Sequence, residues 1–375
     1  MTEADTGGGV TPFAGASIPE PSRSRDPGDV ERALLAWLPS RIGSGATDVR
    51  VGNFDYPVGA GASNETILFE ASWNEGGEER RAELVLRVHP AHNQMFLETY
   101  FREQFDLLSV LHEHQLVKVP RPLWFEDDPD LLGQPFFVMS RLRGRVPVSR
   151  PVYNATGWLV DATPAQRHTV WRSAFRELTR IHAVPIDLVK FLDRPELGST
   201  RLDQLLTYWE RSIPWCTGGR HPQFLLEVAQ WLRDNVPADH VDGLSWGDAR
   251  MGNMMFGDDY ELVGVMDWEQ ASLVGGAVDL GWWLFFDDFH SIDHGLPRLE
   301  GLGGRQETLD LWEELVGSPA PDTRWYEIFT GYAVLQLSVR TLVMYGGKPT
   351  DDDVVGSGFY GRLSDLLGWE RGSVR

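Results

Sequence analysis

The chain has 375 residues, 42% of them hydrophobic and 24% charged, which is enough for two lobes around a large core. Its formal net charge of -21 argues against a nucleic-acid partner, because phosphate backbones are bound by basic faces. The same charge suits a cationic ligand, and a solvated acidic surface is the simpler explanation.

The cysteine count and the hydropathy of the sequence indicate the cellular compartment in which we expect the protein. Cys216 is the only cysteine, so the chain can form no intramolecular disulfide, which fits a reducing cytoplasm. There is no apolar run of membrane-spanning length, and the N-terminus lacks the basic start and apolar stretch of a signal peptide. We therefore expect a cytoplasmic protein that does not enter a membrane.

The N-terminal third predicts a small lobe. Residues 1–27 are rich in Gly, Pro, Ser and Thr and are expected to form a mobile tail. Apolar periodicity then predicts a helix, three strands, a second helix and two strands, at Val30 to Ile42, Asp48 to Asp55, Thr66 to Trp73, Ala82 to Val88, Leu97 to His112, Pro122 to Glu126 and Pro135 to Leu142. We expect residues 28–144 to form an antiparallel sheet plus helix.

Residues 145–375 are predicted to form a larger, mainly helical lobe. Thr163, followed by Pro164 and by Gln166 three residues on, has the pattern of a capping box and opens a helix that reaches Ala183. Six further helices are expected at Leu202 to Ile213, Gln223 to Asn235, Ala277 to Phe289, Arg305 to Val316, Thr323 to Met344 and Asp351 to Gly368. The expected fold class is α+β with two lobes.

One segment contains residues of the types that catalyse a reaction. It reads Trp246-Gly-Asp-Ala-Arg-Met-Gly-Asn, which places Asp248 five residues before Asn253, with Asp267 fourteen residues further on. Phosphoryl transfer needs a carboxylate that takes a proton from the attacking hydroxyl, and hard oxygen ligands that hold Mg²⁺ on the phosphates. Asp248 is the candidate base, and Asn253 and Asp267 are the candidate metal ligands.

A predicted hairpin supports this interpretation, because an Asp followed by an Asn at this spacing is common by chance. Phe256 lies before Gly257-Asp258-Asp259, and the apolar residues Leu262, Val263, Val265 and Met266 follow, a pattern typical of two short strands joined by a turn. Such a hairpin brings Asn253 and Asp267 to the same end, within reach of one ion.

These motifs resemble the aminoglycoside phosphotransferase family, whose loop reads His-Gly-Asp-x-x-x-x-Asn and is followed by a hairpin and Asp-Trp-Glu. The likeness is greatest to a bacterial branch that includes the kinase-like domain fused to some acyl-CoA dehydrogenases. It extends from about Asp48 to the C-terminus and is dense between Ser245 and Trp283. It implies a bilobal protein-kinase-like fold and Mg²⁺-dependent transfer of the γ-phosphate of ATP or GTP to a small-molecule hydroxyl. Trp246 departs from the pattern, since the family has His there to brace the loop.

The resemblance also implies how the small lobe holds the phosphates. Small residues between the first two strands, Gly59 to Asn64, correspond to the family's glycine-rich turn, so Ser63 and Asn64 are expected to contact phosphate. Arg87 stands where the family usually has Lys, and should contact the α- and β-phosphates. Its expected carboxylate partner on the following helix is Glu103, with Glu98 as the alternative.

Further roles follow from the same resemblance. Adenine is expected at the backbone of Ser140, Arg141 and Leu142, where the last small-lobe strand leads into the hinge. Arg250, two residues after Asp248, is expected to meet the transferring phosphate.

Two acidic residues after the hairpin are expected to support the site. Glu269 would assist the metal through water or brace the loop, and Asp279 would hold the backbone of the catalytic loop.

Two alternatives stay open. Trp246 and Arg87 also fit a nucleotide-binding regulator with little transfer activity. A protein kinase fits less well, because the linker from Ala271 to Val278 leaves little room for a peptide platform. The acceptor cannot be read from the sequence.

Overall fold

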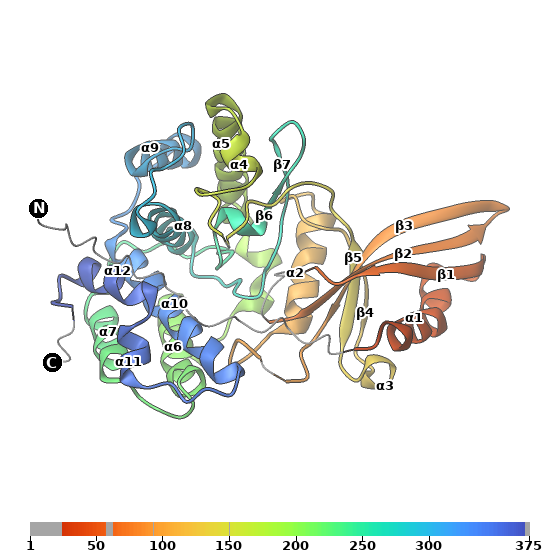
Figure 1. Ribbon diagram of the computed structural model, residues 1–375, viewed down its shortest axis with the longest axis horizontal. Helices are drawn as coiled ribbons and strands as arrows, with labels where there is room; N and C mark the ends of the chain where they lie inside the picture. The colour runs from red at the N-terminus through yellow and green to blue at the C-terminus, as the bar shows by residue number, and fades with distance from the viewer. Residues whose placement is uncertain (1–24, 58–62, 93, 150, 372–375) are drawn as a thin grey trace, which may run out of the picture.

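The computed structural model describes residues 25–57, 63–92, 94–149 and 151–371. A β-sheet with helices forms one end of the molecule and a helical lobe forms the other (Figure 1). This arrangement confirms the predicted α+β bilobal fold. Most of the predicted tail, residues 1–24, lies outside the described residues, as do residues 59–62 of the predicted phosphate turn.

The small lobe contains one antiparallel sheet. Its strands run in the order β1 (Ala46–Asp55), β2 (Glu65–Glu75), β3 (Glu78–Val88), β5 (Phe136–Ser140) and β4 (Pro122–Glu126). Every neighbouring pair is antiparallel. All five predicted strands are confirmed, although β2 and β3 extend further into their shared turn than expected.

The two faces of the sheet pack against different partners. Successive residues of a strand point to opposite faces. The ring of Phe136 lies 4.8 Å from Trp37 of α1 (Pro27–Ile42), whereas the ring of Phe137 lies 5.1 Å from Phe101 of α2 (Phe101–Glu113). Helix α1 therefore covers one face, and α2 lies between the other face and the helical lobe (Figure 1). A short helix, α3 (Pro129–Leu132), joins β4 to β5.

The large lobe is built around a buried helix, α10 (Arg324–Met344), which packs against α6, α7, α8 and α12. The other helices of this lobe are α4 (Trp158–Asp161), α5 (Pro164–His182), α6 (Arg201–Cys216), α7 (Gln223–Asp234), α8 (Gly276–His290), α9 (Arg305–Val316), α11 (Asp351–Val355) and α12 (Gly358–Leu367). Among the described residues, no helix combines the length and apolarity needed to cross a membrane.

Local sequence signals decide two of these helices. The predicted capping box at the start of α5 is confirmed, since Thr163 and Gln166 exchange side-chain and backbone hydrogen bonds. The single helix expected from Asp351 to Gly368 is wrong. Helix α11 ends at Val355, and Ser357 caps the next helix, α12, by accepting a hydrogen bond from the amide of Phe359. Serine favours such caps over helix interiors.

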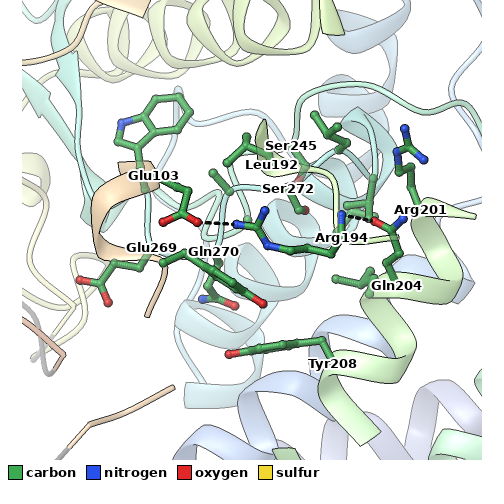
Figure 2. A pocket seen from close by; sticks show the side chains of 18 of the residues that line it. Glu103, Leu192, Arg194, Arg201, Gln204, Tyr208, Ser245, Glu269, Gln270 and Ser272 are labelled. Atoms are coloured by element: carbon green, nitrogen blue, oxygen red, sulfur yellow. Dashed lines mark hydrogen bonds and ion pairs between the residues drawn. The ribbon is translucent and has the colours of Figure 1, made fainter. Parts of the chain in front are cut away.

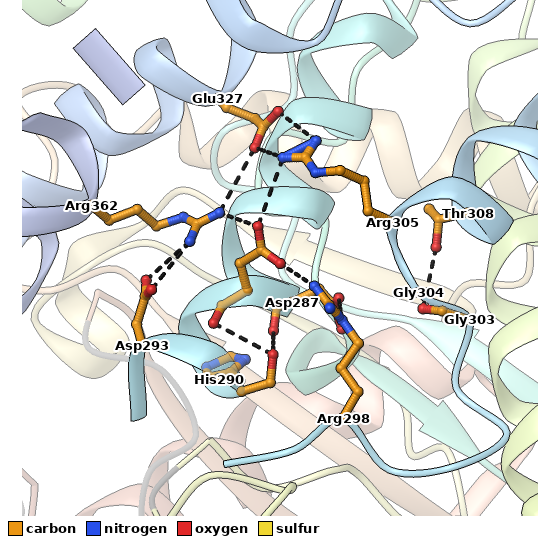
Figure 3. Close-up of polar contacts among 12 residues, drawn as sticks. Asp287, His290, Asp293, Arg298, Gly303, Gly304, Arg305, Thr308, Glu327 and Arg362 are labelled. Carbon is orange, nitrogen blue, oxygen red and sulfur yellow. Dashed lines mark hydrogen bonds and ion pairs between the residues drawn. The ribbon is translucent and has the colours of Figure 1, made fainter. Parts of the chain in front are cut away.

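A network of charges joins α8 to the C-terminal helices (Figure 3). The Asp288 carboxylate contacts both Arg298 and Arg362, and Arg362 also binds Asp293 at 3.2 Å. Glu327 of α10 binds Arg305, which lies 3.7 Å from Asp288. The side chains of Asp288 and Arg362 are only 11% and 12% exposed, so removing one partner leaves a desolvated charge.

We expect Arg362→Met to lower the free energy of unfolding by about 3 kcal/mol, because Asp288 and Asp293 both lose a cation. Urea denaturation followed by circular dichroism measures this. The control is Arg172→Met, whose ion pair with Glu314 is exposed and should contribute less than about 1 kcal/mol. Equal losses in the two variants would contradict a structural role for the network.

Candidate active site

The predicted base lies at a tight turn. Gly247 has a φ of 93°, and a Cβ there would meet the carbonyl oxygen of Gln270 at 2.3 Å. Only glycine fits both the left-handed backbone and this close approach. The turn sets Asp248 directly after the buried backbone of Ser245 and Trp246, with its carboxylate facing the loop that follows.

Both carboxylate oxygens of Asp248 accept hydrogen bonds. The Nε of Arg250 donates to them at 2.9 and 3.1 Å, the amide nitrogen of Asn253 donates at 2.6 Å, and the indole of Trp282 donates at 2.8 Å. Arg250 in turn donates to the hydroxyl of Ser149 at 3.0 Å. These three donors fix the orientation of the Asp248 carboxylate within the loop.

The hairpin brings the two predicted metal ligands together. Strands β6 (Met254–Phe256) and β7 (Leu262–Val265) pair, and the amide of Met266 donates to the carbonyl of Asn253 at 2.9 Å. Asp267 follows directly, with a φ of 60° that turns the chain out of the hairpin. Since the Asn253 amide nitrogen donates to Asp248, its side-chain oxygen is left for another partner.

At this end of the hairpin, the three carboxylates of Asp248, Asp267 and Glu269 face two arginines, Arg87 and Arg250. Burial raises the pKa of Asp267, and the Asp248 carboxylate raises it further, against the opposing effect of Arg87. Burial also raises the pKa of Glu269 to about 7, again with a contribution from the neighbouring Asp267. A half-buried carboxylate whose charge is incompletely offset, beside an amide oxygen, is a donor set that fits a divalent cation with hard oxygen preference.

Trp246 braces this loop in place of the His that the resemblance predicts. Its indole nitrogen donates to the carbonyls of Met266 and Asp267, at 3.0 and 2.9 Å, and the ring is fully buried. Trp246 therefore connects the loop that carries Asp248 to the segment that carries Asp267 through an N–H donor.

We expect Trp246→Phe to keep the buried ring but lose this donor, leaving two buried carbonyls with one partner fewer. The free energy of unfolding should fall by roughly 1–3 kcal/mol, and nucleotide binding should weaken with it. Thermal unfolding and calorimetric titration check both effects. Trp231→Phe, a half-buried position on α7 away from the site, is the control. An unchanged Trp246→Phe protein would show that the indole N–H does not brace the loop.

Asp279 of α8 fixes the other side of the loop. Its carboxylate accepts hydrogen bonds from the amides of Trp246 and Gly247, from the Ser245 hydroxyl and from His182, all between 2.7 and 2.9 Å. This matches the loop-holding role predicted for Asp279.

The predicted partner of Arg87 is wrong. Arg87 binds Glu269 at 2.7 Å, whereas Glu103 binds Arg194 at 3.2 Å. Arg194 also stacks over the ring of Tyr100 at 4.1 Å. The segment before α6 therefore supplies a cation to α2, and the carboxylate for Arg87 comes from the loop after Asp267.

Groups of the predicted phosphate site meet at Glu269. Asn64 donates to its carboxylate at 2.5 Å beside Arg87, and the Ser63 hydroxyl also lowers the Glu269 pKa by hydrogen bonding. Ser63, Asn64 and Arg87 therefore lie together around Glu269, the carboxylate that was expected to assist the metal through water or to brace the loop.

Two of the three backbone amides expected to bind adenine already donate hydrogen bonds within the protein. The amide of Ser140 donates to the carbonyl of Arg121, and the amide of Arg141 donates to the carbonyl of Glu83. Neither N–H is free for adenine, which leaves Leu142 as the hinge amide to test. The Leu142 side chain lies against Gly264 of β7, so it connects the hinge to the hairpin.

The sequence profile of the phosphotransferase enzyme family matches residues 56–315. The probable acyl-CoA dehydrogenase IBR3 of Arabidopsis thaliana is 26% identical over 71% of this chain and 33% of that protein. Human acyl-CoA dehydrogenase family member 11 is 22% identical over 49% of this chain and 24% of that protein. The chain thus spans at most about a third of these curated relatives.

Solved structures share the fold at low sequence identity. A Ralstonia eutropha protein provisionally named an aminoglycoside phosphotransferase has a TM-score of 0.62 at 18% identity, over 89% of this chain and 96% of that one. APH(2")-IIIa, solved in complex with GDP and kanamycin, has a TM-score of 0.53 at 16% identity, over 89% of this chain and 99% of that one. Because the profile spans well over half of the chain and both lobes, the protein belongs to the phosphotransferase enzyme family.

Proposed function

We propose that the protein transfers the γ-phosphate of ATP or GTP to a hydroxyl of a small molecule, with Mg²⁺. The observation that carries the proposal is the convergence of Asp248, Asn253 and Asp267 on one loop and hairpin. A neighbour of the same fold was solved with GDP, and an amicoumacin kinase with AMP-PNP and Ca²⁺, which supports a nucleotide and a divalent ion here.

The reaction assigns a task to each group. Asp248 accepts the proton of the acceptor hydroxyl as its oxygen bonds to the γ-phosphorus, and the bond to the β–γ bridging oxygen breaks. Asn253 and Asp267 would hold Mg²⁺, which neutralises developing phosphate charge when bound. Residues 28–144 would bind the nucleotide and residues 145–375 the acceptor.

Two existing contacts must change when the reactants bind. Arg250 occupies both oxygens of Asp248, so its guanidinium has to turn toward the phosphate as the acceptor hydroxyl arrives. Arg87, Ser63 and Asn64 now surround Glu269 and would share their donors with the phosphates. The nucleotide-binding regulator stays the second candidate, because the Asp248 carboxylate is so fully engaged.

The deciding experiment is a panel of hydroxyl compounds offered with Mg-ATP and Mg-GTP, with product followed by ³¹P NMR. Formation of a phosphate ester with stoichiometric nucleoside diphosphate supports the transferase. Nucleotide binding with neither transfer nor slow hydrolysis supports the regulator.

We expect Arg87→Ala to raise the nucleotide KM by roughly 10–100-fold, the value of a charge-assisted contact. Arg87→Lys should recover part of it, because the charge persists while the two-pronged geometry is lost. Arg81→Ala, an exposed change on the same strand, is the control. Steady-state kinetics measures all three, and an unchanged KM in Arg87→Ala would remove Arg87 from the phosphate site.

A further inference from the structure

The segment that leads from the hinge into the helical lobe runs beside the catalytic loop. Arg145 and Phe256 of β6 exchange backbone hydrogen bonds at 2.8 and 2.9 Å, so this segment pairs with the edge of the β6–β7 hairpin. A few residues further on, Ser149 forms a bridge to Val152. These contacts hold Ser149 next to the part of the chain that leads from Asp248 to the hairpin.

Gly252 lets the Ser149 side chain approach the catalytic loop. A Cβ at residue 252 would lie 2.5 Å from Oγ of Ser149 and 2.6 Å from Nη1 of Arg250, so any larger residue would displace both groups. The Ser149 hydroxyl thus lies over the loop backbone. Ser149 is half-buried, so its hydroxyl is not sealed within the core.

The guanidinium of Arg250 connects this hydroxyl to the candidate base. Its Nη1 donates to Oγ of Ser149 at 3.0 Å, and its Nε donates to the two carboxylate oxygens of Asp248 at 2.9 and 3.1 Å. Arg250 is also the cation expected to meet the transferring phosphate. The Ser149 oxygen therefore lies beside the position that the γ-phosphate is expected to take.

The hydrogen bonding of Ser149 suits a nucleophile. Its oxygen accepts from Arg250, and no group among the described residues accepts its hydroxyl hydrogen. That hydrogen is left to donate to Asp248 once Arg250 turns toward the phosphate. A cation beside the oxygen also stabilises the negative charge that develops as the proton leaves.

Other serines near the loop are placed differently. Figure 2 shows Ser245 and Ser272 at a cavity whose lining, among the described residues, includes neither Asp248 nor Arg250. Ser245 is fully buried and donates to Asp279 at 2.9 Å. Of these three serines, Ser149 alone contacts the cation that is expected to meet the phosphate.

We propose that Ser149 is an internal phosphate acceptor, so that the protein phosphorylates itself there when no small-molecule acceptor is present. This inference rests on the proposed function, because it uses the same base and the same nucleotide. Oγ of Ser149 forms a bond to the γ-phosphorus, and its proton passes to Asp248. The bond from that phosphorus to the β–γ bridging oxygen breaks, which releases ADP or GDP.

Self-phosphorylation competes with transfer to a small molecule. Both hydroxyls need the Asp248 carboxylate, and both need Arg250 at the transferring phosphate. A compound that serves as an acceptor should therefore slow the phosphorylation of Ser149. A phosphate on Ser149 also keeps its negative charge beside Arg250, so the modified protein holds the cation that a second nucleotide would need.

The test incubates the full chain with Mg-ATP or Mg-GTP and no acceptor, and follows its intact mass. The wild type should gain one phosphate, which peptide fragmentation should place on Ser149. Ser149→Ala should gain none, and Ser149→Thr, which keeps a hydroxyl, should gain one at position 149. The rate should not depend on protein concentration, because the step is intramolecular. Asp248→Asn should lower it by about 10²–10⁴-fold.

Three controls complete the experiment. Thr156→Ala removes an exposed hydroxyl from the same segment and should leave the mass gain unchanged. Calorimetry with AMP-PNP shows that Ser149→Ala still folds and binds nucleotide. Phosphate on another residue, or a rate proportional to protein concentration, overturns the inference. The same samples are offered the panel of hydroxyl compounds under ³¹P NMR. Transfer to a compound without phosphate on Ser149 overturns this inference and leaves the proposed function standing, whereas nucleotide binding without transfer, hydrolysis or a mass gain overturns both.

Discussion

Asp248→Asn should lower the rate of phosphoryl transfer by about 10²–10⁴-fold, the usual value of general-base assistance. An amide oxygen can still accept the hydrogen bonds of Arg250 and Trp282, whereas the new amide nitrogen loses the one from Asn253, so the loop should keep most of its contacts. Nucleotide binding should stay within a factor of about three, because Asp248 is expected to contact the acceptor. Single-turnover kinetics with saturating acceptor measures the rate, and calorimetry measures the nucleotide affinity.

The control for this variant is Asp258→Asn, which removes an exposed carboxylate from the hairpin turn and should leave the rate unchanged. If no acceptor has been identified, slow Mg-ATP hydrolysis is the readout for both proteins. Full activity in Asp248→Asn would remove the base assignment. A loss of nucleotide binding equal to the loss of rate would make Asp248 a binding group instead.

Features that depend on neighbouring residues could be predicted from the sequence. The hairpin β6–β7 follows from apolar runs on either side of Gly257-Asp258-Asp259, and its pairing alone brings Asn253 beside Asp267. The start of α5 follows from the reciprocal bonds of Thr163 and Gln166. In these cases the groups that interact are close in the chain, so spacing carries the geometry.

Features that depend on tertiary packing could not be predicted from the sequence. Glu103 was expected to meet Arg87, but Arg194, ninety-one residues further along the chain, lies over Tyr100 and takes that carboxylate. The indole of Trp282 reaches Asp248 only because α8 packs behind the loop. Side-chain type indicates that such residues can bind a charge, and only the packing of distant segments decides which one.

Trp246 lies between these cases. The motif shows that the residue before Gly247 should brace the loop, and the usual His differs in size and chemistry from an indole. The structure keeps the same kind of contact, an N–H donor aimed at the carbonyls of Met266 and Asp267. The function of the position could thus be predicted from the sequence, but the means by which Trp fulfils it could not.

Asp267→Asn should weaken Mg-nucleotide binding by about 100-fold, since a charged oxygen ligand is replaced by a neutral one. Binding of the nucleotide without metal should be unchanged or tighter, because one carboxylate that repels the phosphates is gone. Calorimetric titration with Mg²⁺ and with EDTA separates the two effects. Asp259→Asn, in the exposed turn of the same hairpin, is the control.

Folding stability gives an independent test of the same site. Burial raises the pKa of Asp267, so the folded state binds a proton more tightly than the unfolded state does. Wild-type stability contributed by this group therefore falls as the pH rises above the ordinary aspartate value, and Asp267→Asn lacks that loss. Without metal, the variant should be at least as stable as the wild type at pH 8. Added Mg²⁺ and nucleotide should stabilise the wild type far more than the variant, whereas equal stabilisation of the two would make Asp267 a structural residue rather than a metal ligand.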